Sequence, residues 1–198
     1  MLDRLRTWFE KFAPLSGAAW AALVPHVRPR TLARHETFVQ PGDQPLALGF
    51  LLSGTARQFY RLPDGTERTT YFFFQHDALA DYRACVLGQP AALTIEALAP
   101  CALLTFPYAA LLRLYDDFPA WERVGRRIAE YVAAGLEARL VETLTLTPEA
   151  RYRLLVATPA RHKLLEQVPQ HLLAAYLGVT PVSLSRIRGR VAGNGGVS

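Results

Sequence analysis

Between residues 28 and 106 the sequence is divided by turn signals into apolar runs that are too short for helices. Clusters of Gly, Pro, Ser and Asp mark these turns at 41–43, 53–54 and 63–65. Asp64 and Gly65 stand between two alternating segments and predict a tight hairpin. The runs of strand length are 46–52, 55–62, 67–74, 95–98 and 102–106. Short strands without alternating helices predict an antiparallel β-roll of the jelly-roll kind, and hence an α+β chain.

Helical patterns precede and follow this region. Near the N-terminus apolar residues recur at helical spacing, at Leu2, Leu5, Phe9 and Phe12. Ser16 is expected to cap a second helix that ends near Pro25. After the roll, a single helix is predicted over 118–146, with Asp116 and Asp117 favouring the positive end of its dipole and Pro119 in its first turn.

The helix predicted over 118–146 carries one apolar stripe. Its members are Trp121, Val124, Ile128, Val132, Leu136, Leu140 and Leu144. A helix of this length gains little from propensity alone and needs a partner surface. It either lies on the roll or pairs with its own copy in a homodimer.

A new domain is expected to begin at Thr147, because Thr147, Pro148 and Glu149 provide a cap, a first-turn proline and a first-turn acid. Four short helices are predicted beyond this boundary, over 151–156, 161–167, 170–177 and 181–192, followed by a flexible tail rich in Gly. The sequence thus divides into a sensor-like roll at 1–117, a linking helix at 118–146 and an all-α domain at 147–198.

The formal charge of +5 lies in the last of these parts. Residues 1–146 hold 15 Lys and Arg against 15 Asp and Glu, whereas residues 147–198 hold seven against two. A neutral body with a basic terminal domain is typical of a polyanion-binding head on a regulatory body, although a basic surface without a partner would have the same composition.

Residues 170–190 have the spacing of a helix-turn-helix. Counted from Gln170, the small residue Ala174 is fifth and the turn residue Gly178 is ninth. Apolar anchors stand at positions four, eight, ten, fifteen and eighteen: Leu173, Leu177, Val179, Leu184 and Ile187. All the packing demands of the motif are met, and the alternative is an incidental helical hairpin.

In such a motif the second helix enters the major groove of double-stranded DNA. Arg186 is the best candidate for a bidentate contact with guanine, while Val182 and Ser185 also face outward. Thr180 and Ser183 are expected to donate to phosphates. The backbone contacts are assigned to Arg188, Arg190, Arg161 and Lys163.

Together, the helical lead-in, the roll, the striped helix and the helix-turn-helix resemble the Crp/Fnr family of bacterial transcription regulators. The closest segments are FVQPGDQPLALGFLLSGTARQFYRLPDGTERTTYFFF and YLGVTPVSLSRIR. The resemblance implies a cyclic-nucleotide-binding-like sensor, a homodimer paired through 118–146, and a near-palindromic operator.

The nucleotide-binding members of that family carry Gly-Glu-Leu and, about ten residues after the Glu, Arg followed by Ser or Thr. Here 80–82 reads Ala-Asp-Tyr, and Ala91 and Ala92 stand at the Arg and Ser positions. A buried phosphate needs charge-assisted donors, which two alanines do not supply, so we expect no tight cyclic-nucleotide binding. An unknown small-molecule effector could instead bind in a pocket lined by His76, Asp81, Tyr82, Ala91, Ala92, Thr94 and Glu96, and the alternative is that these are surface loop and strand residues that bind no ligand.

The predicted DNA-binding domain, residues 147–198, also departs from the family pattern. Where members often have an acid, Val182 offers only apolar contact, for instance with a thymine methyl, so the family's operator is not carried over. The eight residues after Arg190 leave no room for the family's β-wing.

Several other classes receive little support. The longest uncharged run, 97–112, is too short for a membrane helix, and the N-terminus has no signal-peptide pattern, so we expect a cytoplasmic protein. Cys85 and Cys101 fit no metal pattern, and no cofactor or catalytic residue is predicted. Two alternatives to the regulator are a cupin-like enzyme, for which the histidines are too scattered, and a sensor that acts through protein contacts without specific DNA binding.

Overall fold

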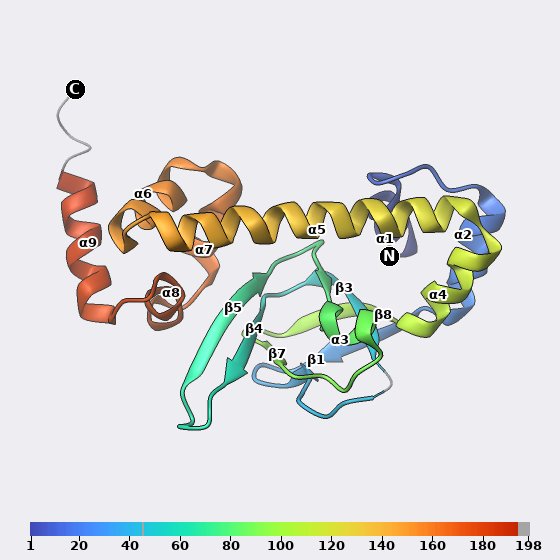
Figure 1. Ribbon diagram of the computed structural model, residues 1–198, viewed down its shortest axis with the longest axis horizontal. Helices are drawn as coiled ribbons and strands as arrows, with labels where there is room; N and C mark the ends of the chain where they lie inside the picture. The colour runs from blue at the N-terminus through green and yellow to red at the C-terminus, as the bar shows by residue number, and fades with distance from the viewer. Residues whose placement is uncertain (45, 194–198) are drawn as a thin grey trace.

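The computed structural model describes residues 1–44 and 46–193. It is an α+β structure in which two antiparallel sheets form a roll, a long helix crosses the roll, and a group of short helices follows at one end (Figure 1). The fold class predicted from the sequence is therefore confirmed. The described residues contain no helix with the length and hydropathy needed to cross a bilayer.

The roll consists of two four-stranded sheets. The first sheet has the order β1 (Arg28–Leu32), β8 (Cys101–Pro107), β3 (Ala47–Ser53) and β6 (Ala78–Leu79). The second has the order β2 (Thr37–Val39), β7 (Thr94–Ala97), β4 (Ala56–Arg61) and β5 (Glu67–Phe73). Leu51, Ile95 and Leu103 are fully buried between the two sheets. The five strands predicted from the sequence are all present, with ends within one residue of those expected.

The hairpin predicted at Asp64 and Gly65 joins β4 to β5. Gly65 has φ +83, and Leu62 N–H donates to Thr66 O at 2.8 Å. Strands β1, β2 and β6 lie in the region expected to be a roll, but their short or charged sequences did not single them out. Edge strands of this kind carry few apolar residues, which is why alternation in the sequence does not reveal them.

Two helices of the roll depart from the prediction. α3 (Tyr82–Leu87) interrupts the strands, and α4 (Tyr108–Asp117) follows β8 directly. Asp116 and Asp117 precede the long helix, as expected, but they also form the end of α4, which the sequence did not predict. The break comes at Phe118, whose extended backbone (φ −138, ψ 107) stands between the two helices.

Helix α5 (Pro119–Thr145) has 27 residues and lies within one residue of its predicted bounds. Its first turns are held by α1 (Leu2–Glu10) and α2 (Gly17–Leu23): Trp121 and Val124 are fully buried, and Trp121 Nε1 donates to Ala19 O at 2.8 Å. Ser16 caps α2 as predicted, accepting from Ala19 N–H at 3.1 Å. A 3₁₀ turn, η1 (Val24–His26), then leads into the roll.

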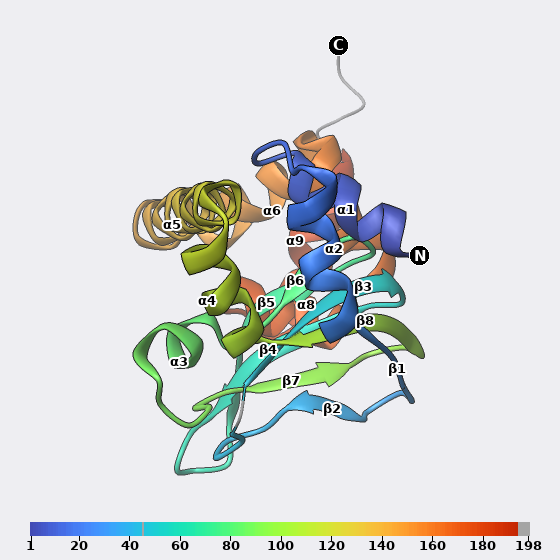
Figure 2. The same ribbon diagram turned by 90° about the vertical axis from the view of Figure 1, so that its right-hand side faces the viewer.

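The apolar stripe of α5 changes character along the helix. Its first residues are buried, while Leu136, Leu140 and Leu144 are 59%, 56% and 75% exposed. Figure 2, which looks along α5, places this helix at one side of the roll, beside α4 and above α3. The single chain therefore covers only the N-terminal half of the stripe.

The terminal group contains α6 (Pro148–Ala157), η2 (Pro159–Arg161), α7 (His162–Gln167), α8 (Gln170–Leu177) and α9 (Pro181–Gly193). Thr147 caps α6 as predicted, accepting from Ala150 N–H at 3.2 Å. These helices share one core with Phe72 of β5 and with Phe74, which follows that strand. Most of the predicted flexible tail, and most of the stretch expected to lack a β-wing, lie outside the described residues.

Candidate functional site

Helices α8 and α9 pack through the residues that the sequence spacing singled out. Leu173, Ala174, Leu177, Leu184 and Ile187 are at most 5% exposed, and Val179 is half-buried. All of them join one core with α6 and α7. The inner faces of the helix pair are thus used in packing, so the side chains left for contact with a partner are those on the outer faces of the two helices.

The turn between the two helices depends on Gly178. Its left-handed backbone (φ +73, ψ 30) ends α8, and the N–H groups of Gly178 and Val179 donate to Ala175 O and Ala174 O, each at 3.0 Å. Glycine adopts this conformation without steric cost. The side-chain nitrogen of Arg151 donates to Leu177 O at 2.6 Å and secures the same turn from α6.

Helix α9 begins with a side-chain cap. Thr180 Oγ1 accepts from Ser183 N–H at 3.2 Å and donates to Ser183 Oγ at 3.0 Å. A Thr cap followed by Pro181 is a favoured helix start. The two hydroxyls that were expected to meet phosphates are therefore turned toward each other in the unbound protein.

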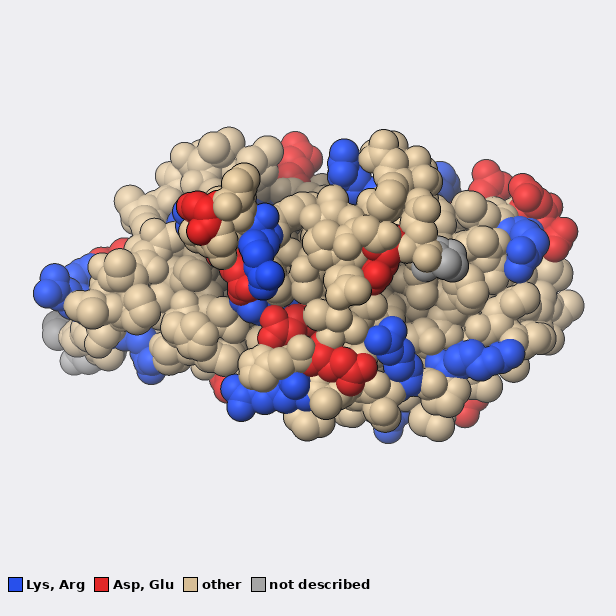
Figure 3. Space-filling view, turned by 90° about the horizontal axis from the view of Figure 1, so that it is seen from below, with Lys and Arg blue, Asp and Glu red and all other residues tan. Residues whose placement is uncertain are grey.

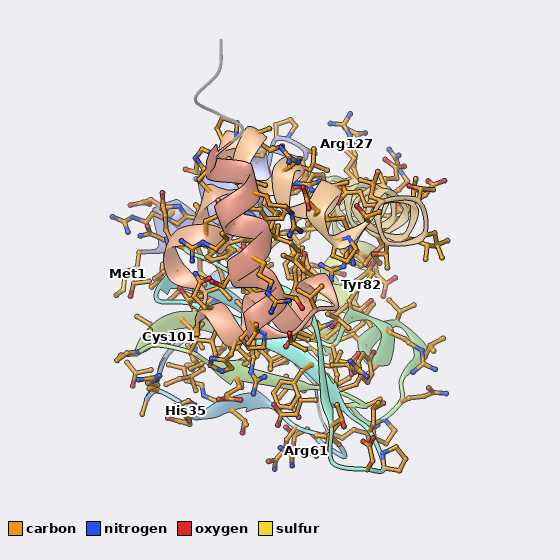
Figure 4. The ribbon with its side chains drawn as sticks, turned by 90° about the vertical axis from the view of Figure 1, so that its left-hand side faces the viewer. Met1, His35, Arg61, Tyr82, Cys101 and Arg127 are labelled. Atoms are coloured by element: carbon orange, nitrogen blue, oxygen red, sulfur yellow. The ribbon has the colours of Figure 1, made fainter. Side chains whose placement is uncertain are left out.

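The outer face of α9 presents Val182, which is 63% exposed, together with the exposed Ser185 and Arg186. Within residues 1–44 and 46–193 the Arg186 side chain has no hydrogen-bond or ion-pair partner. Figure 4 views the molecule from this end, with α9 in front of the other terminal helices and Arg61 at the base of the hairpin below it. A solvent-exposed guanidinium without an internal partner is available to a ligand without any competing contact being broken.

The other arginines of this region are held by internal partners. Arg188 donates to Gln170 Oε1 at 2.7 Å, and Arg190 makes two contacts with Glu149 Oε2 at 2.6 and 2.9 Å. Arg161 forms a bidentate ion pair with Glu142 at 2.6 and 2.9 Å. Sequence reasoning missed these pairings because the acids lie 19 and 41 residues away in the chain.

These ion pairs lower the pKa values of the carboxyl groups that take part in them. The hydrogen bond from Arg161 holds the pKa of Glu142 below its usual value. Hydrogen bonds from Arg153 and Arg190 likewise lower the pKa of Glu149. Figure 3 shows Lys and Arg side chains near the end of the molecule where α9 lies, and mixed acidic and basic side chains across the middle. On α9, Glu149 neutralises Arg190, whereas Arg186 and Arg188 have no acidic partner among the described residues.

The segment of the roll that the resemblance aligns with the family's nucleotide-binding motif, residues 80–92, is called the cassette. Unlike the exposed Arg186, its charged residue Asp81 is buried. Asp81 is 3% exposed, and both of its carboxylate oxygens accept main-chain hydrogen bonds, from Ala84 N–H and Ala92 N–H at 3.0 Å each. It caps α3 and ties that helix to the segment preceding β7. Ala91 is 4% exposed, and its N–H donates to Asp43 O at 3.2 Å. The cassette is closed by contacts within the chain.

The remaining pocket candidates do not surround Asp81. Glu96 lies on the face of β7 opposite the buried Ile95, where it accepts from Arg57 at 2.9 Å and contacts His35 Nδ1 at 2.6 Å. Thr94, half-buried, stands on the same face. In Figure 4 His35 and Tyr82 lie on opposite sides of the molecule. The structure brings together Asp81, Ala91 and Ala92, but not Glu96.

His76 and Tyr82 are exposed. His76 has φ +73 in the turn between β5 and β6, and its ring stacks on Phe50 with centroids 6.0 Å apart. Burial raises the pKa of Tyr82, although its side chain is 37% exposed and lies at the start of α3. Neither side chain is among the hydrogen-bond partners of Asp81.

No group of His, Cys, Asp and Glu side chains suited to a metal ion occurs in the described part of the chain. Cys85 and Cys101 are buried free thiols, and burial raises the pKa of Cys85 to about 11. A thiol with a raised pKa is a poor nucleophile at neutral pH.

Comparison with known proteins identifies the roll. Residues 29–118 match the cyclic nucleotide-binding domain. No curated protein sequence matches the chain. The similarity to solved structures extends beyond the cyclic nucleotide-binding domain, to proteins that combine it with further helices.

Three of these structures are regulators of the CAP, Crp and Fnr type. Catabolite Activator Protein of Thermus thermophilus is 25% identical, with a TM-score of 0.55 over 94% of this chain and 88% of that chain. DNR of Pseudomonas aeruginosa is 20% identical, with a TM-score of 0.56 over 99% of this chain and 87% of that one. FixK2 of Bradyrhizobium japonicum is 15% identical, with a TM-score of 0.67 over 85% and 86%. The resemblance inferred from the sequence is thereby confirmed for the fold.

Proposed function

We propose that this chain is a DNA-binding transcription regulator of the Crp/Fnr type. It binds a near-palindromic operator in double-stranded DNA as a homodimer and uses the roll (1–117) as sensor, 118–146 as dimerisation helix and 147–198 as reading head. The observation that carries the proposal is α9: its inner face is packed, while its outer face presents Val182 and an Arg186 that has no partner among the described residues.

In this proposal Arg186 contacts guanine in the major groove, and Val182 meets apolar base atoms beside it. Arg188 and Arg190 contact the DNA backbone once they leave Gln170 and Glu149. Thr180 and Ser183 lie near the phosphates at the start of α9. Their hydroxyls, which are hydrogen-bonded to each other in the unbound protein, then donate to phosphate oxygens. Ser185 is the neighbouring polar side chain on the exposed face.

The exposed half of α5 supports the dimer. Leu136, Leu140 and Leu144 repeat every four residues and leave an apolar stripe that a second copy would cover. We expect Leu140→Glu to give a monomer in light scattering coupled to size exclusion, because a charge in a paired helix interface is desolvated without a partner. A dimer of unchanged stability in this variant would place the interface elsewhere.

The same proposal assigns no cyclic nucleotide to the roll. Both oxygens of Asp81 are already engaged by main-chain N–H groups, and Ala91 and Ala92 offer no side-chain donor to a phosphate. Calorimetric titration with cAMP and with cGMP is expected to show no binding in the micromolar range. Micromolar affinity for either nucleotide would contradict this part of the proposal.

The main test is a gel shift with a pool of random DNA duplexes over a series of salt concentrations. A regulator retains a selected subset, and its affinity falls steeply as salt rises, because phosphate contacts release counterions. Absence of retention for every duplex at low salt would favour the alternative, a sensor that acts through protein contacts without specific DNA binding.

A further inference from the structure

Three consecutive phenylalanines, Phe72 and Phe73 at the end of β5 and Phe74 directly after it, are buried in two different cores. Phe73 faces the core between the two sheets, whereas Phe72 and Phe74 join the core of the terminal helices. Phe72 is 3% exposed and Phe74 9%. An apolar run with both faces covered identifies a strand that lies between two layers. Here the second layer is the group α6–α9.

The contact between β5 and these helices is closely packed. The rings of Phe72 and Tyr176 lie 5.3 Å apart with an interplanar angle of 57°, and the Lys163 ammonium stands 5.9 Å from the Phe74 ring centre. Thr55 Oγ1 donates to Gln167 Oε1 at 3.0 Å at the same boundary. Two parts of a chain are expected to move relative to each other unless their interface is large and apolar. The apolar contact of Phe72 and Phe74 with α6–α9 therefore restricts such motion.

Helix α5 adds a third side to this contact. The Arg139 guanidinium lies 3.9 Å from the centre of the Tyr176 ring and also donates to the Tyr176 hydroxyl. Burial lowers the pKa of Arg139, since α5 and α8 enclose the side chain. Tyr176 of α8 is therefore held from one direction by β5 and from another by α5. Because α8 carries α9 through the Gly178 turn, fixing Tyr176 fixes the direction of α9.

We propose that Phe72, Arg139 and Tyr176 form an orientation clamp, through which the sensor strand β5 sets the angle of α9 to the dimer axis and hence the operator half-site spacing that the protein accepts. The inference rests on the proposed function, because spacing has meaning only for a dimer that binds DNA. The three residues act as positioning residues, since they hold the reading head without touching DNA.

The test measures the affinity of the protein for DNA as a function of the distance between the two operator half-sites. The full chain first selects an operator from a pool of random duplexes, and a second series then moves the two half-sites apart or together by single base pairs. For the unaltered chain we expect about tenfold weaker binding when the spacing changes by one or two base pairs, because each base pair also rotates the half-site about the DNA axis.

Three variants weaken the clamp to different degrees. Arg139→Gln removes the cation and Tyr176→Phe removes only the hydroxyl, so both leave the apolar core in place. Phe72→Leu removes the aromatic pair. We expect Arg139→Gln to tolerate altered spacing within about twofold while binding an isolated half-site as before. Arg139→Lys, which keeps a cation for the ring, restores part of the preference.

Arg126→Gln is the matched control, because Arg126 stands on the same helix but, among the described residues, pairs only with Glu130. Its spacing profile is expected to equal that of the unaltered chain. Spacing profiles for Arg139→Gln and Phe72→Leu as steep as that of the unaltered chain would overturn the clamp, since the head would then be oriented by other contacts.

A second experiment tests the clamp without DNA, so that failure of the clamp can be distinguished from failure of the proposed function. If the unaltered chain retains no duplex, the clamp is tested by electron-spin distance measurement between labels at Asp64→Cys in the hairpin and Arg188→Cys in α9. Cys85 and Cys101 are buried and do not compete for the label. A narrow distance distribution that broadens with Arg139→Gln supports the clamp, and an equally narrow distribution in both proteins overturns it.

Discussion

The cassette around Asp81 and the outer face of α9 differ in the burial and the hydrogen bonding of their charged side chains. Asp81 is buried, and both of its oxygens accept hydrogen bonds from the chain itself. Arg186 is exposed and has no such partner in the described residues. A buried charge is tolerated only when its hydrogen bonds are satisfied, so Asp81 is a structural residue. A solvated charge without internal contacts costs little to keep and is free to bind.

The comparison indicates where, under the proposed function, recognition is expected. The cyclic nucleotide-binding fold is present in residues 29–118, yet Ala91, which the sequence resemblance aligns with the phosphate-binding Arg of that family, is a buried alanine. At the other end of the molecule, apolar residues form the core between α8 and α9, and Val182, Ser185 and Arg186 remain exposed on the outer face of α9. Under the proposed function, fold and ligand specificity are thus separable.

The largest effect is expected at Asp81. Asp81→Ala leaves the N–H groups of Ala84 and Ala92 without an acceptor and should lower the free energy of unfolding by about 2–3 kcal/mol. Arg186→Ala should change it by less than about 0.5 kcal/mol, because an exposed side chain without contacts adds little. Equilibrium urea unfolding at one fixed protein concentration measures both. Equal effects of the two substitutions would remove the contrast between the two regions.

A smaller effect is expected at the turn that carries α9. Gly178→Ala forces a Cβ into a left-handed backbone (φ +73) and should cost about 1 kcal/mol. Gly189 provides the control, because it lies within α9 with open space around it, so that Gly189→Ala should be neutral or stabilising by up to about 1 kcal/mol. Thermal unfolding of the two variants distinguishes them. A neutral Gly178→Ala would show that the turn does not need glycine.

The smallest effect concerns the Glu142–Arg161 pair, which joins α5 to the start of the terminal helices. Arg161 lowers the pKa of Glu142 below its usual 4.5, so the pair stabilises the folded state above that value, and its contribution is lost as the pH falls through the lowered pKa. Because the pair is partly exposed, Glu142→Gln should cost at most about 0.5 kcal/mol at neutral pH.

The pH profile of unfolding provides the check on this pair. The difference in stability between the unaltered chain and Glu142→Gln should be present at pH 7 and vanish well below pH 4.5. A difference that stayed constant with pH would mean that the glutamate acts through packing rather than charge.

Much of the fold follows from local sequence signals. Turn residues such as Asp64 and Gly65 predicted the hairpin, and the caps Ser16 and Thr147 predicted helix starts, because each depends on neighbours within a few positions. Helix α4 was missed because its sequence continues the apolar run of β8, which period alone does not assign to strand or helix. The position of Asp116 at the end of α4 was missed for the same reason.

The site was predicted less completely. The spacing of residues 170–190 identified the buried and exposed faces of α9, because helix geometry determines them. The partners of Arg161 and Arg190 depend on tertiary contacts with distant acids and could not be read locally. The position of Glu96 opposite Ile95 was accessible from strand alternation, but its pairing with Arg57 and His35 was not. The consecutive phenylalanines at 72–74 were the available signal for the contact between β5 and the head.

The most direct test of the central claim compares Arg186→Ala with Arg126→Ala in DNA binding. Both remove one exposed arginine, but only Arg186 lies on the outer face of α9. For a selected duplex against a scrambled one, measured at the same salt concentration, Arg186→Ala should lose about 1–3 kcal/mol of discrimination, whereas Arg126→Ala should lose none. Unchanged discrimination in Arg186→Ala would contradict the assignment of α9 as the reading helix.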